Sequence, residues 1–488
     1  MRPSLPMKCR IGTRWIVRAI LCWPIADRYP REKAMTLTHK SDQQADPSQD
    51  FAEITKKTIF VACIGTALEW YDVFAYLYFS LTIAKLFFPA SDPTVSLLLA
   101  VGTYALTYIA KPVGAFVFAS YADRVSRKQA LTYTLSVMAL GVAIITFTPS
   151  YQTIGVAASF MMMLARLIQG FSSGGEYGTS TAFLVERSPI HLRGYYSSFN
   201  ISAIGITSVL GGVLGIAIHS AFTAQQVDDW AWRLPFALGL LIIPVSVYLR
   251  RRIPEVHNGV KRARSPLTLV LKNYKQLSLL GIGAFAPITV TNAALGFFLP
   301  TYAIKFLNMS PNQAFLATAL YGLVQCFLSP VFGYMSDRYG RRPIMNIAAL
   351  LLAVSAIPAF YLLVKNPTLL NLVICELVLG IFATAYQGPM PALLCDLYPP
   401  EARATGVAVV HDITATVLNG FTPFVISLLV TLTGSAAIPG YYIALFAALA
   451  WFCLRGLARF DVAAKTASPG VKFGARQDEE FSQAAPTL

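Results

Sequence analysis

The sequence has few charged side chains and few cysteines for its length. Only 13% of its 488 residues are Asp, Glu, Lys or Arg, whereas soluble domains average about 25%. The seven Cys residues are scattered singly, with no C-x-x-C motif and no Cys/His cluster. This scatter argues against disulfide bonds and against a zinc site. We therefore expect that the protein binds no metal or cofactor and is not an enzyme. The low content of charged residues also argues against a soluble protein.

Long apolar runs take the place of the missing charge. Apolar residues make up 55% of the chain, and its mean hydropathy is +0.56. About twelve largely apolar runs of roughly 18 or more residues are each long enough to cross a ~30 Å hydrocarbon core as a helix. Their approximate centres are 69, 107, 139, 166, 207, 241, 289, 324, 353, 379, 417 and 447. The pattern predicts an all-α integral membrane protein with twelve transmembrane helices.

The net charge of +15 lies mostly between these runs. Lys and Arg gather in every second loop, whereas the other loops hold little more than Lys85, Lys305 and Lys365. Cytoplasmic loops of membrane proteins carry this excess of Lys and Arg, so we expect both termini in the cytoplasm. The excess of positive charge is thus explained by the orientation of the chain in the membrane. We expect the lipid bilayer as a partner, and we do not expect the protein to bind nucleic acid.

Polar segments divide the chain. Residues 1–34 are basic and hold a short apolar patch, so they are either a targeting presequence or an untranslated stretch before a start at Met35. We expect a disordered cytoplasmic N-terminal arm (1–56), a six-helix bundle (57–251), a cytoplasmic linker (252–275), a second six-helix bundle (276–460) and a disordered cytoplasmic tail (461–488).

The two bundles are predicted to be copies of one another. The turn at 123–127, Asp-Arg-Val-Ser-Arg, recurs 214 positions later at 337–341 as Asp-Arg-Tyr-Gly-Arg. An even number of spans in each copy gives the copies the same orientation, with a pseudo-two-fold axis along the membrane normal. An acid, a proline and an arginine recur at an offset of 210, where Glu186, Pro189 and Arg193 match Asp396, Pro399 and Arg403. At the same offset, Arg166 matches Glu376.

These turns resemble the signature G-x-x-x-D-R-x-G-R-[RK] of the major facilitator superfamily. The second copy, from Gly333 to Arg342, fits fully, whereas the first departs from it and has Ser126 where the second glycine is usual. Other motifs resemble the metabolite:proton symporter branch, whose members carry citrate, 2-oxoglutarate, shikimate, proline or betaine. They are Gly65-Thr-Ala-Leu-Glu69-Trp70-Tyr71-Asp72, Lys111-Pro112-Val-Gly114 and the stretch from Arg166 to Gly178. The resemblance covers about 55–460 and implies the major facilitator fold, proton symport and these substrate classes.

Asp72 and Arg166 are the residues that we expect to couple transport to protons. Both fall near the middle of the bilayer, in the first and fourth spans, where an ionisable residue is a functional candidate by default. An arginine beside a carboxylate keeps it ionised, and separating the two favours uptake of a proton. The related sugar:proton symporters are similar here, with an aspartate and an arginine in these spans. Glu69, on the same helix face as Asp72, is an alternative proton carrier, and a permanently ionised structural pair is the other interpretation.

Other polar residues at span depth are candidates for a substrate cavity. Lys111 stands where the family usually has Arg, so it keeps the charge but loses the planar fork that grips a carboxylate. It either touches substrate or reaches toward interfacial water. The remaining cavity candidates of this kind are Tyr71, Tyr108, Gln169 and Asn200.

Three ionisable candidates lie in the second copy. Histidine is the side chain suited to proton transfer near neutral pH, so His411 is a candidate for proton transfer or for binding an acid group. It precedes Asp412, and on a helix the two side chains point about 100° apart and need not bond. A buried histidine satisfied by a helix carbonyl is the alternative. Glu376 either lines the cavity or pairs with a Lys or His of the same copy.

Charged residues at the cytoplasmic helix ends are predicted to form a gate of ion pairs. Exposed pairs contribute only about 0–1 kcal/mol each, which suits two conformations that must lie within a few kcal/mol of one another. We expect Glu186 to pair with Arg193, and Asp396 with Arg403. In the alternative, these charges only set the orientation of the chain in the membrane. The candidate set is Asp123, Arg124, Arg127, Glu186, Arg193, Asp337, Arg338, Arg341, Asp396 and Arg403.

The resemblance implies a secondary transporter of the cell (inner) membrane that imports a small organic acid with protons by alternating access. Intramembrane cations at Arg166 and Lys111 favour an anionic substrate. Proline- or betaine-type zwitterions are the alternative substrates, and a transporter-like receptor that signals without net transport is a further alternative. A uniporter remains if Asp72 and Arg166 never separate. We expect a monomer whose partners are a small-molecule substrate and protons.

Overall fold

The computed structural model describes residues 59, 63, 66–67, 70–124, 127–174, 176–240, 266–399 and 402–466. The predicted arm at 1–56 lies outside the described residues, as do most of the linker and the tail beyond 466. Residues 51–488 form one compact unit. Within its described part every regular element is a helix, as expected for an all-α protein.

The first half of the chain builds a series of helices that begins with the segment 70–78 and ends with the helical segment 234–240. Between them lie α3 (Ser80–Phe87), α4 (Pro93–Arg124), α5 (Arg127–Phe147), α6 (Tyr151–Ile154), α7 (Val156–Ser172), α8 (Glu176–Arg187), η1 (Ile190–Leu192), α9 (Arg193–Ala221), α10 (Ala224–Asp229) and η2 (Ala231–Arg233).

The second half repeats this plan. It comprises α12 (Pro266–Asn273), α13 (Lys275–Thr291), η3 (Asn292–Phe297), α14 (Leu299–Leu307), α15 (Pro311–Tyr339), α16 (Arg341–Lys365), α17 (Leu369–Gln387), α18 (Met390–Asp396), α19 (Arg403–Thr414), η4 (Ala415–Asn419), α20 (Thr422–Thr433) and α21 (Ile438–Thr466). The region predicted as the linker (252–275) contains α12. The last helix, α21, continues past residue 460, where the second bundle was predicted to end.

Eight helical stretches of the described chain are long and apolar enough to cross a membrane. They contain the predicted centres 107, 207, 289, 324, 353, 379, 417 and 447. The centres 139 and 166 fall in the shorter apolar helices Tyr133–Phe147 and Val156–Ser172. The centres 69 and 241 fall where the structure describes the chain only in part.

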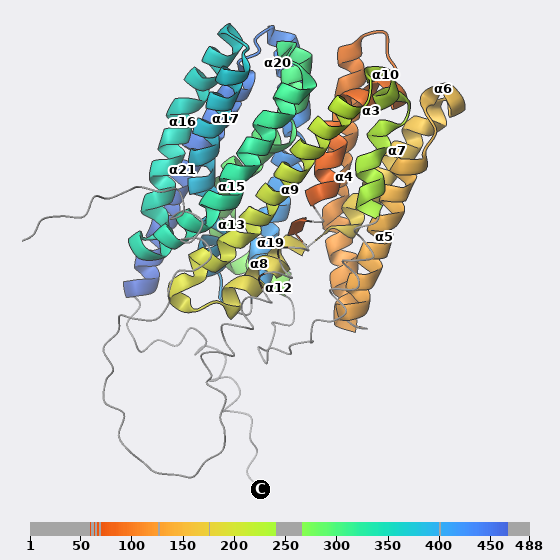
Figure 1. Ribbon diagram of the computed structural model, residues 1–488. Coiled ribbons are helices and arrows are strands. Elements are labelled where there is room, and N and C mark those ends of the chain that lie inside the picture. Colours follow the sequence, from red (N-terminus) through yellow and green to blue (C-terminus); the bar gives the residue numbers. More distant parts are fainter. Residues whose placement is uncertain are drawn as a thin grey trace, which may run out of the picture. The chain divides into compact units, whose positions relative to one another are not determined.

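Several of these helices expose large apolar side chains on their outer surface. On α16, Ile347, Val354 and Tyr361 recur every seven residues and are each at least 60% exposed. A soluble protein rarely carries so continuous an apolar face, whereas lipid tails are a suitable solvent for it. Helices α16, α17 and α21 lie side by side (Figure 1).

Two helices of the second half are interrupted by π-helical segments, η3 and η4, which the sequence analysis did not anticipate. Each is followed by a proline, Pro300 and Pro423 respectively. Proline has no N–H to donate and clashes with the carbonyl four residues earlier, which belongs to Gly296 in η3 and to Asn419 in η4. The Gly296 carbonyl instead accepts a hydrogen bond of 2.9 Å from the Tyr78 hydroxyl of the first half.

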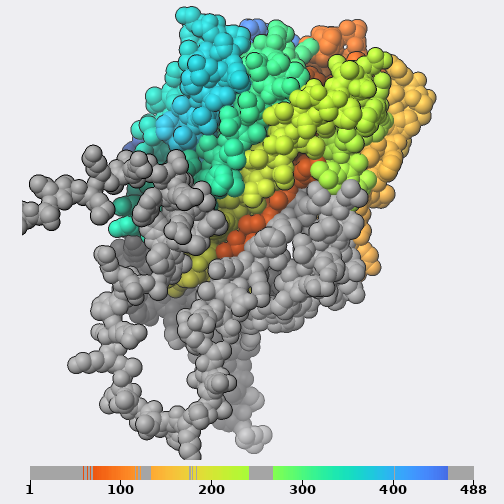
Figure 2. Space-filling model, in the orientation of Figure 1, coloured from red at the N-terminus to blue at the C-terminus, as the bar shows by residue number. Residues whose placement is uncertain are grey.

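The most extensive helix–helix contact joins α9 of the first half to α15 of the second. Figure 2 shows the side chains of α9 (yellow-green) lying directly against those of α15 (green). Glycines face one another across this contact, Gly194 against Gly333 and Gly205 against Gly322. Because neither side has a Cβ there, the two backbones approach closely.

Glycines also allow close packing inside the first half. A Cβ on Gly114 of α4 would collide with the backbone of Phe171, and a Cβ on Gly170 of α7 would collide with that of Thr107. Gly114 and Gly170 therefore serve helix packing.

Candidate functional site

Arg166 and Asp72 meet in the interior of the first half. Arg166 Nη1 lies 3.4 Å from Asp72 Oδ2, and both side chains are buried. The guanidinium also stacks on Tyr76, with Cζ 3.8 Å from the ring centroid. Tyr76 is four residues after Asp72 on one helix face, so a single helix supplies the carboxylate and the aromatic ring. The structure thus brings together the two residues expected to couple transport to protons.

The Arg166 guanidinium keeps further donors for another group. Its Nε and Nη2 atoms are buried and have no hydrogen-bond partner among the described residues. Gln169, one turn later on α7, lies beside the Asp72 carboxyl without reaching hydrogen-bond geometry. The Trp70 Nε1 atom is likewise buried without a partner in this part of the chain. These atoms are placed to bind a polar ligand or water.

Lys111 is buried inside α4. Its ammonium lies 4.9 Å from the ring centroid of Tyr108 and 6.0 Å from that of Trp70. The alternative in which this side chain reaches interfacial water is therefore wrong, because the aromatic faces hold the charge in the interior.

Tyr108 also links the two halves. Its hydroxyl accepts hydrogen bonds from the Tyr104 hydroxyl at 3.0 Å and from Asn419 Nδ2 of η4 at 2.9 Å. The Thr416 hydroxyl donates to the Tyr108 carbonyl at 3.0 Å. Tyr104 lies within electrostatic range of both Lys111 and Arg166. A chain of polar groups therefore runs from the buried cations to the second half.

Two other cavity candidates have their polar atoms engaged in helix packing. The Tyr71 hydroxyl donates to the Pro235 carbonyl at 2.9 Å. The Asn200 amide accepts from the Thr66 hydroxyl at 2.7 Å and donates to Thr181 at 3.0 Å. These bonds tie neighbouring helices together and leave Tyr71 and Asn200 less suited to contact a substrate.

A buried amide network occupies the second half. Gln325 Nε2 donates to Asn292 Oδ1 at 3.0 Å and to Gln387 Oε1 at 2.6 Å. Gln387 Nε2 in turn donates to Asn292 Oδ1 and to the Thr291 hydroxyl, both at 3.1 Å. Asn292 begins the π segment η3, so the network fixes the point at which that helix changes its winding.

Glu376 lies in the same half on α17 and is fully buried. Neither of its carboxyl oxygens has a hydrogen-bond partner in the part of the chain that the structure describes. The predicted alternative of a Lys or His partner is therefore wrong for this conformation.

His411 and Asp412 hydrogen-bond one another, with 2.8 Å between His411 Nδ1 and Asp412 Oδ1. Adjacent residues of a helix point about 100° apart, so this bond was not expected. The imidazole also stacks on Tyr177 of the first half, at 3.9 Å between ring centroids and 10° between planes. The pair therefore lies at a contact between the two halves.

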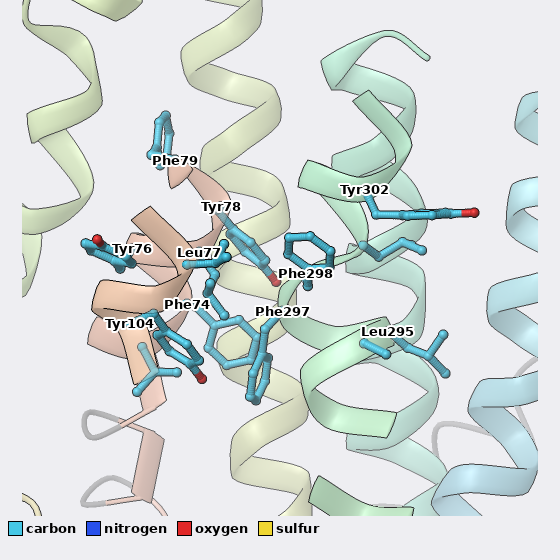
Figure 3. Close-up of a cluster of buried hydrophobic side chains, with 14 of the residues drawn as sticks. Phe74, Tyr76, Leu77, Tyr78, Phe79, Tyr104, Leu295, Phe297, Phe298 and Tyr302 are labelled. Carbon is cyan, nitrogen blue, oxygen red and sulfur yellow. The ribbon is translucent and has the colours of Figure 1, made fainter. Parts of the chain in front are cut away.

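Aromatic side chains close the region between the segment 70–78 and η3 (Figure 3). The Phe74 and Phe297 rings meet edge to face, with centroids 4.4 Å apart, and Trp70 contacts Phe297 at 5.3 Å. Beyond them, the Ser80 and Thr301 hydroxyls lie 2.8 Å apart. The two halves therefore contact each other on this side of Asp72.

The other side carries the predicted gate residues, and we call the end marked by Arg193, Arg341 and Arg403 the basic end. Arg403 Nη1 lies 3.4 Å from Glu186 Oε1, and Arg193 Nη1 lies 3.7 Å from Asp396 Oδ1. The pairing predicted within each half is wrong: each acid pairs with the arginine of the other half. These ion pairs join the halves.

Asp337 extends this junction by capping a helix of the other half. Its Oδ1 and Oδ2 atoms accept hydrogen bonds of 2.8 Å from the backbone N–H groups of Gly194 and Tyr195, at the start of α9. The first N–H groups of a helix have no partner within the helix, and a carboxylate at this position accepts their hydrogen bonds. Its negative charge is also stabilised by the positive end of the helix dipole. Arg341 forms ion pairs with Asp337, at 3.8 Å, and with Asp396.

The remaining gate candidates contribute less. Arg338 is exposed and faces the ring of Tyr339. The side chains of Asp123, Arg124 and Arg127 lie outside the described residues, as does Glu69.

The sequence did not reveal four residues that make contacts here. They are Tyr76, Tyr177, Asn419 and Gly194, whose backbone N–H donates to the Asp337 cap. Tyr76 had a local signal, since it follows Asp72 by one helical turn. The other three act across the junction of the halves, for which a single sequence offers no spacing rule.

Family models match the two halves separately. Residues 58–264 match "Sugar (and other) transporter", and residues 282–483 match "Major Facilitator Superfamily". Solved structures of the xylose transporter XylE share the fold, with TM-scores of 0.65 and 0.64 at 17% and 18% identity. They cover 83% of this chain, and 96% and 97% of theirs.

Curated relatives fall in two groups. The citrate-proton symporter of Klebsiella pneumoniae is 33% identical over 79% of this chain and 87% of its own. The proline/betaine transporter of Escherichia coli (strain K12) is 29% identical over 80% of each. The paired turns, the buried Asp72–Arg166 pair and these relatives together show that the chain belongs to the major facilitator superfamily, in its metabolite:proton symporter branch.

Proposed function

We propose that this protein imports a small organic acid together with protons across the inner membrane of the cell, by alternating access. The Asp72–Arg166 pair is the observation that carries the proposal, because a buried ion pair at this depth is costly to form and becomes costlier still when one partner is withdrawn.

Proton coupling follows from making and breaking this pair. While Arg166 lies beside Asp72, its positive charge favours the ionised form of the carboxylate. A conformational change or a bound anion that draws Arg166 away leaves the carboxylate without its counter-charge, and it then takes up a proton. The ring face of Tyr76 stabilises the guanidinium of Arg166 by a cation–π contact while the pair forms and breaks.

The buried cations favour an anionic substrate. Arg166 offers Nε and Nη2 as donors without a partner among the described residues, and Lys111 adds a second positive charge that, like Arg166, lies within electrostatic range of Tyr104. The ammonium of Lys111 already occupies the faces of Trp70 and Tyr108. A quaternary ammonium substrate would need those faces for itself, so the geometry disfavours a betaine headgroup there.

Proline- or betaine-type zwitterions remain the second candidate, because transporters of these compounds are among the relatives. Glu376 is the observation in their favour, since a buried carboxyl in the second half suits a cationic group on the substrate. A zwitterion would then place its carboxylate toward Arg166 and its ammonium toward the second half.

The basic end is the cytoplasmic end in this proposal, as the loop charges require. Contacts join the described parts of the halves both there and on the aromatic side, and in the proposed cycle we take this conformation as an occluded intermediate. Opening to the cytoplasm requires the ion pairs of Glu186 and Asp396, and the cap at Asp337, to break.

Uptake measurements test the function. Cells expressing the protein are given labelled mono-, di- and tricarboxylates, proline and glycine betaine, with and without a protonophore. We expect accumulation of an acid that collapses with the protonophore. Accumulation that survives the protonophore would contradict proton symport, and uptake of proline or betaine alone would select the second candidate.

A further inference from the structure

Glu376 stands apart from the other buried charges of this protein. It occupies the position of the second copy that matches Arg166 in the first, but it has no counter-charge among the residues that the structure describes. Its carboxyl is fully buried and makes no hydrogen bond to any described residue.

Phenol and thiol groups are the polar groups found near Glu376. Within electrostatic range lie the phenols of Tyr321 on α15 and Tyr78 on the segment 70–78, together with the thiol of Cys375 on its own helix. No Lys, Arg or His of the described chain acts on it. Asp72, by contrast, lies against Arg166.

An ionised carboxylate without a partner is strongly disfavoured in an apolar interior, and such a group becomes neutral instead. Glu376 therefore carries its proton in this conformation. The protein thus holds two buried carboxyl groups in unlike surroundings, one beside a guanidinium and one without a hydrogen-bond partner among the described residues, and acid–base and proton-transfer sites use such pairs.

Tyr78 connects Glu376 to the movement of the halves. It comes from the first half, reaches across to the η3 region (Figure 3) and donates to the Gly296 carbonyl at 2.9 Å. When the halves separate on this side, Tyr78 withdraws with its own half. Water then gains access to the region that Tyr78 now fills, and the Glu376 carboxyl can exchange its proton with that water.

We propose that Glu376 is a second proton-binding group of the transport cycle, protonated in the occluded state and in exchange with water when the halves part beside Tyr78. The inference rests on the proposed proton symport. Its carboxylate takes a proton from hydronium on one side of the membrane, forming the O–H bond and leaving water, and returns that proton to water on the other side.

Infrared spectroscopy tests the protonation without any substrate. The purified protein in lipid nanodiscs should show a carboxylic-acid C=O stretch that disappears in Glu376→Gln and persists in Asp72→Asn. Gln matches the neutral Glu in size and charge, so the variant should fold. A spectrum unchanged in Glu376→Gln would mean that Glu376 is ionised, and the inference would be overturned.

Proteoliposomes containing the acid identified by the uptake panel test the coupling. Loss of one coupled proton should lower the maximal accumulation ratio of Glu376→Gln about tenfold for each pH unit of gradient. A proton-coupled wild type with an equal ratio in Glu376→Gln would overturn the inference alone. A wild type indifferent to the pH gradient would instead overturn the proposed function.

Discussion

Glu186 of the first half pairs with Arg403 of the second, at 3.4 Å. The same bond is repeated with the roles of the halves exchanged, since Arg193 of the first half lies 3.7 Å from Asp396 of the second. Acid and arginine recur at an offset of 210, so the two ion pairs are related by the internal duplication. The acid and the arginine present in each copy therefore form two equivalent ion pairs between the halves at the basic end.

Charge reversal tests this cross-pairing. Glu186→Arg should favour opening of the basic end by about 1 kcal/mol, the upper range for a partly exposed pair. Cys395 is buried at this end, and its rate of maleimide labelling should rise by up to about fivefold. Adding Arg403→Glu restores the attraction and should return the rate toward that of the wild type.

Arg338→Gln is the matched control for this experiment, because Arg338 forms no ion pair within the described residues. It should leave Cys395 labelling unchanged. Rescue of Glu186→Arg by Arg193→Glu, in place of Arg403→Glu, would show that the pairs form within each half after all.

The cap at Asp337 gives a second measure of the same closure. An asparagine offers one acceptor oxygen for the two N–H groups of Gly194 and Tyr195, so Asp337→Asn should weaken the closed state by about 0.5–2 kcal/mol. The labelling rate of Cys395 should rise accordingly. An unchanged rate in Asp337→Asn would show that the cap does not hold the halves together.

Asp72→Asn should separate coupling from binding. The variant cannot release or accept the proton, so accumulation against a gradient should be lost while exchange of substrate across the membrane continues. Uphill uptake and counterflow, measured on the same proteoliposomes, distinguish the two. Asp228→Asn, at the exposed pair with Lys85, is the control, and full accumulation by Asp72→Asn would remove Asp72 from the proton path.

Lys111→Met tests the substrate charge. Methionine keeps an unbranched chain between Trp70 and Tyr108 but removes the ammonium, so KM for an organic acid should rise at least about tenfold, or about 1.4 kcal/mol. Lys111→Arg should keep KM closer to that of the wild type. The exposed Lys85 provides the control variant Lys85→Met, and an unaltered KM in Lys111→Met would show that this cation does not contact the acid.

Gly205→Ala tests the close approach of α9 and α15. Its Cβ would come within 2.6 Å of the Cys326 backbone nitrogen and 2.7 Å of the Gly322 carbonyl oxygen. Neither backbone can move aside alone, so the variant should be destabilised by about 1–3 kcal/mol. Thermal unfolding in detergent measures this, with Gly102→Ala as control because its Cβ would meet only Phe424 side-chain atoms at 3.7 Å.

Local sequence was sufficient for the residues whose roles depend on depth and helix direction. Asp72 and Arg166 lie in helices that run in opposite directions and stand at similar distances from their ends, which predicted that they meet. Lys111 shows where this reasoning stopped. Its depth in the membrane could be read from the sequence. Whether its ammonium reaches water or lies against aromatic rings could not, because Trp70 comes from another helix.

The sequence by itself determined the helical membrane class, the duplication and the identity of the buried charges, because hydropathy and repeat spacing are properties of the chain. Only the tertiary structure decided that Glu186 bonds to Arg403, that Asp337 caps α9 and that Glu376 has no counter-charge. Each of these depends on how one half docks against the other or on which side chains share a buried space. Contacts of that kind are fixed by packing across the junction, and no local pattern in the chain encodes them.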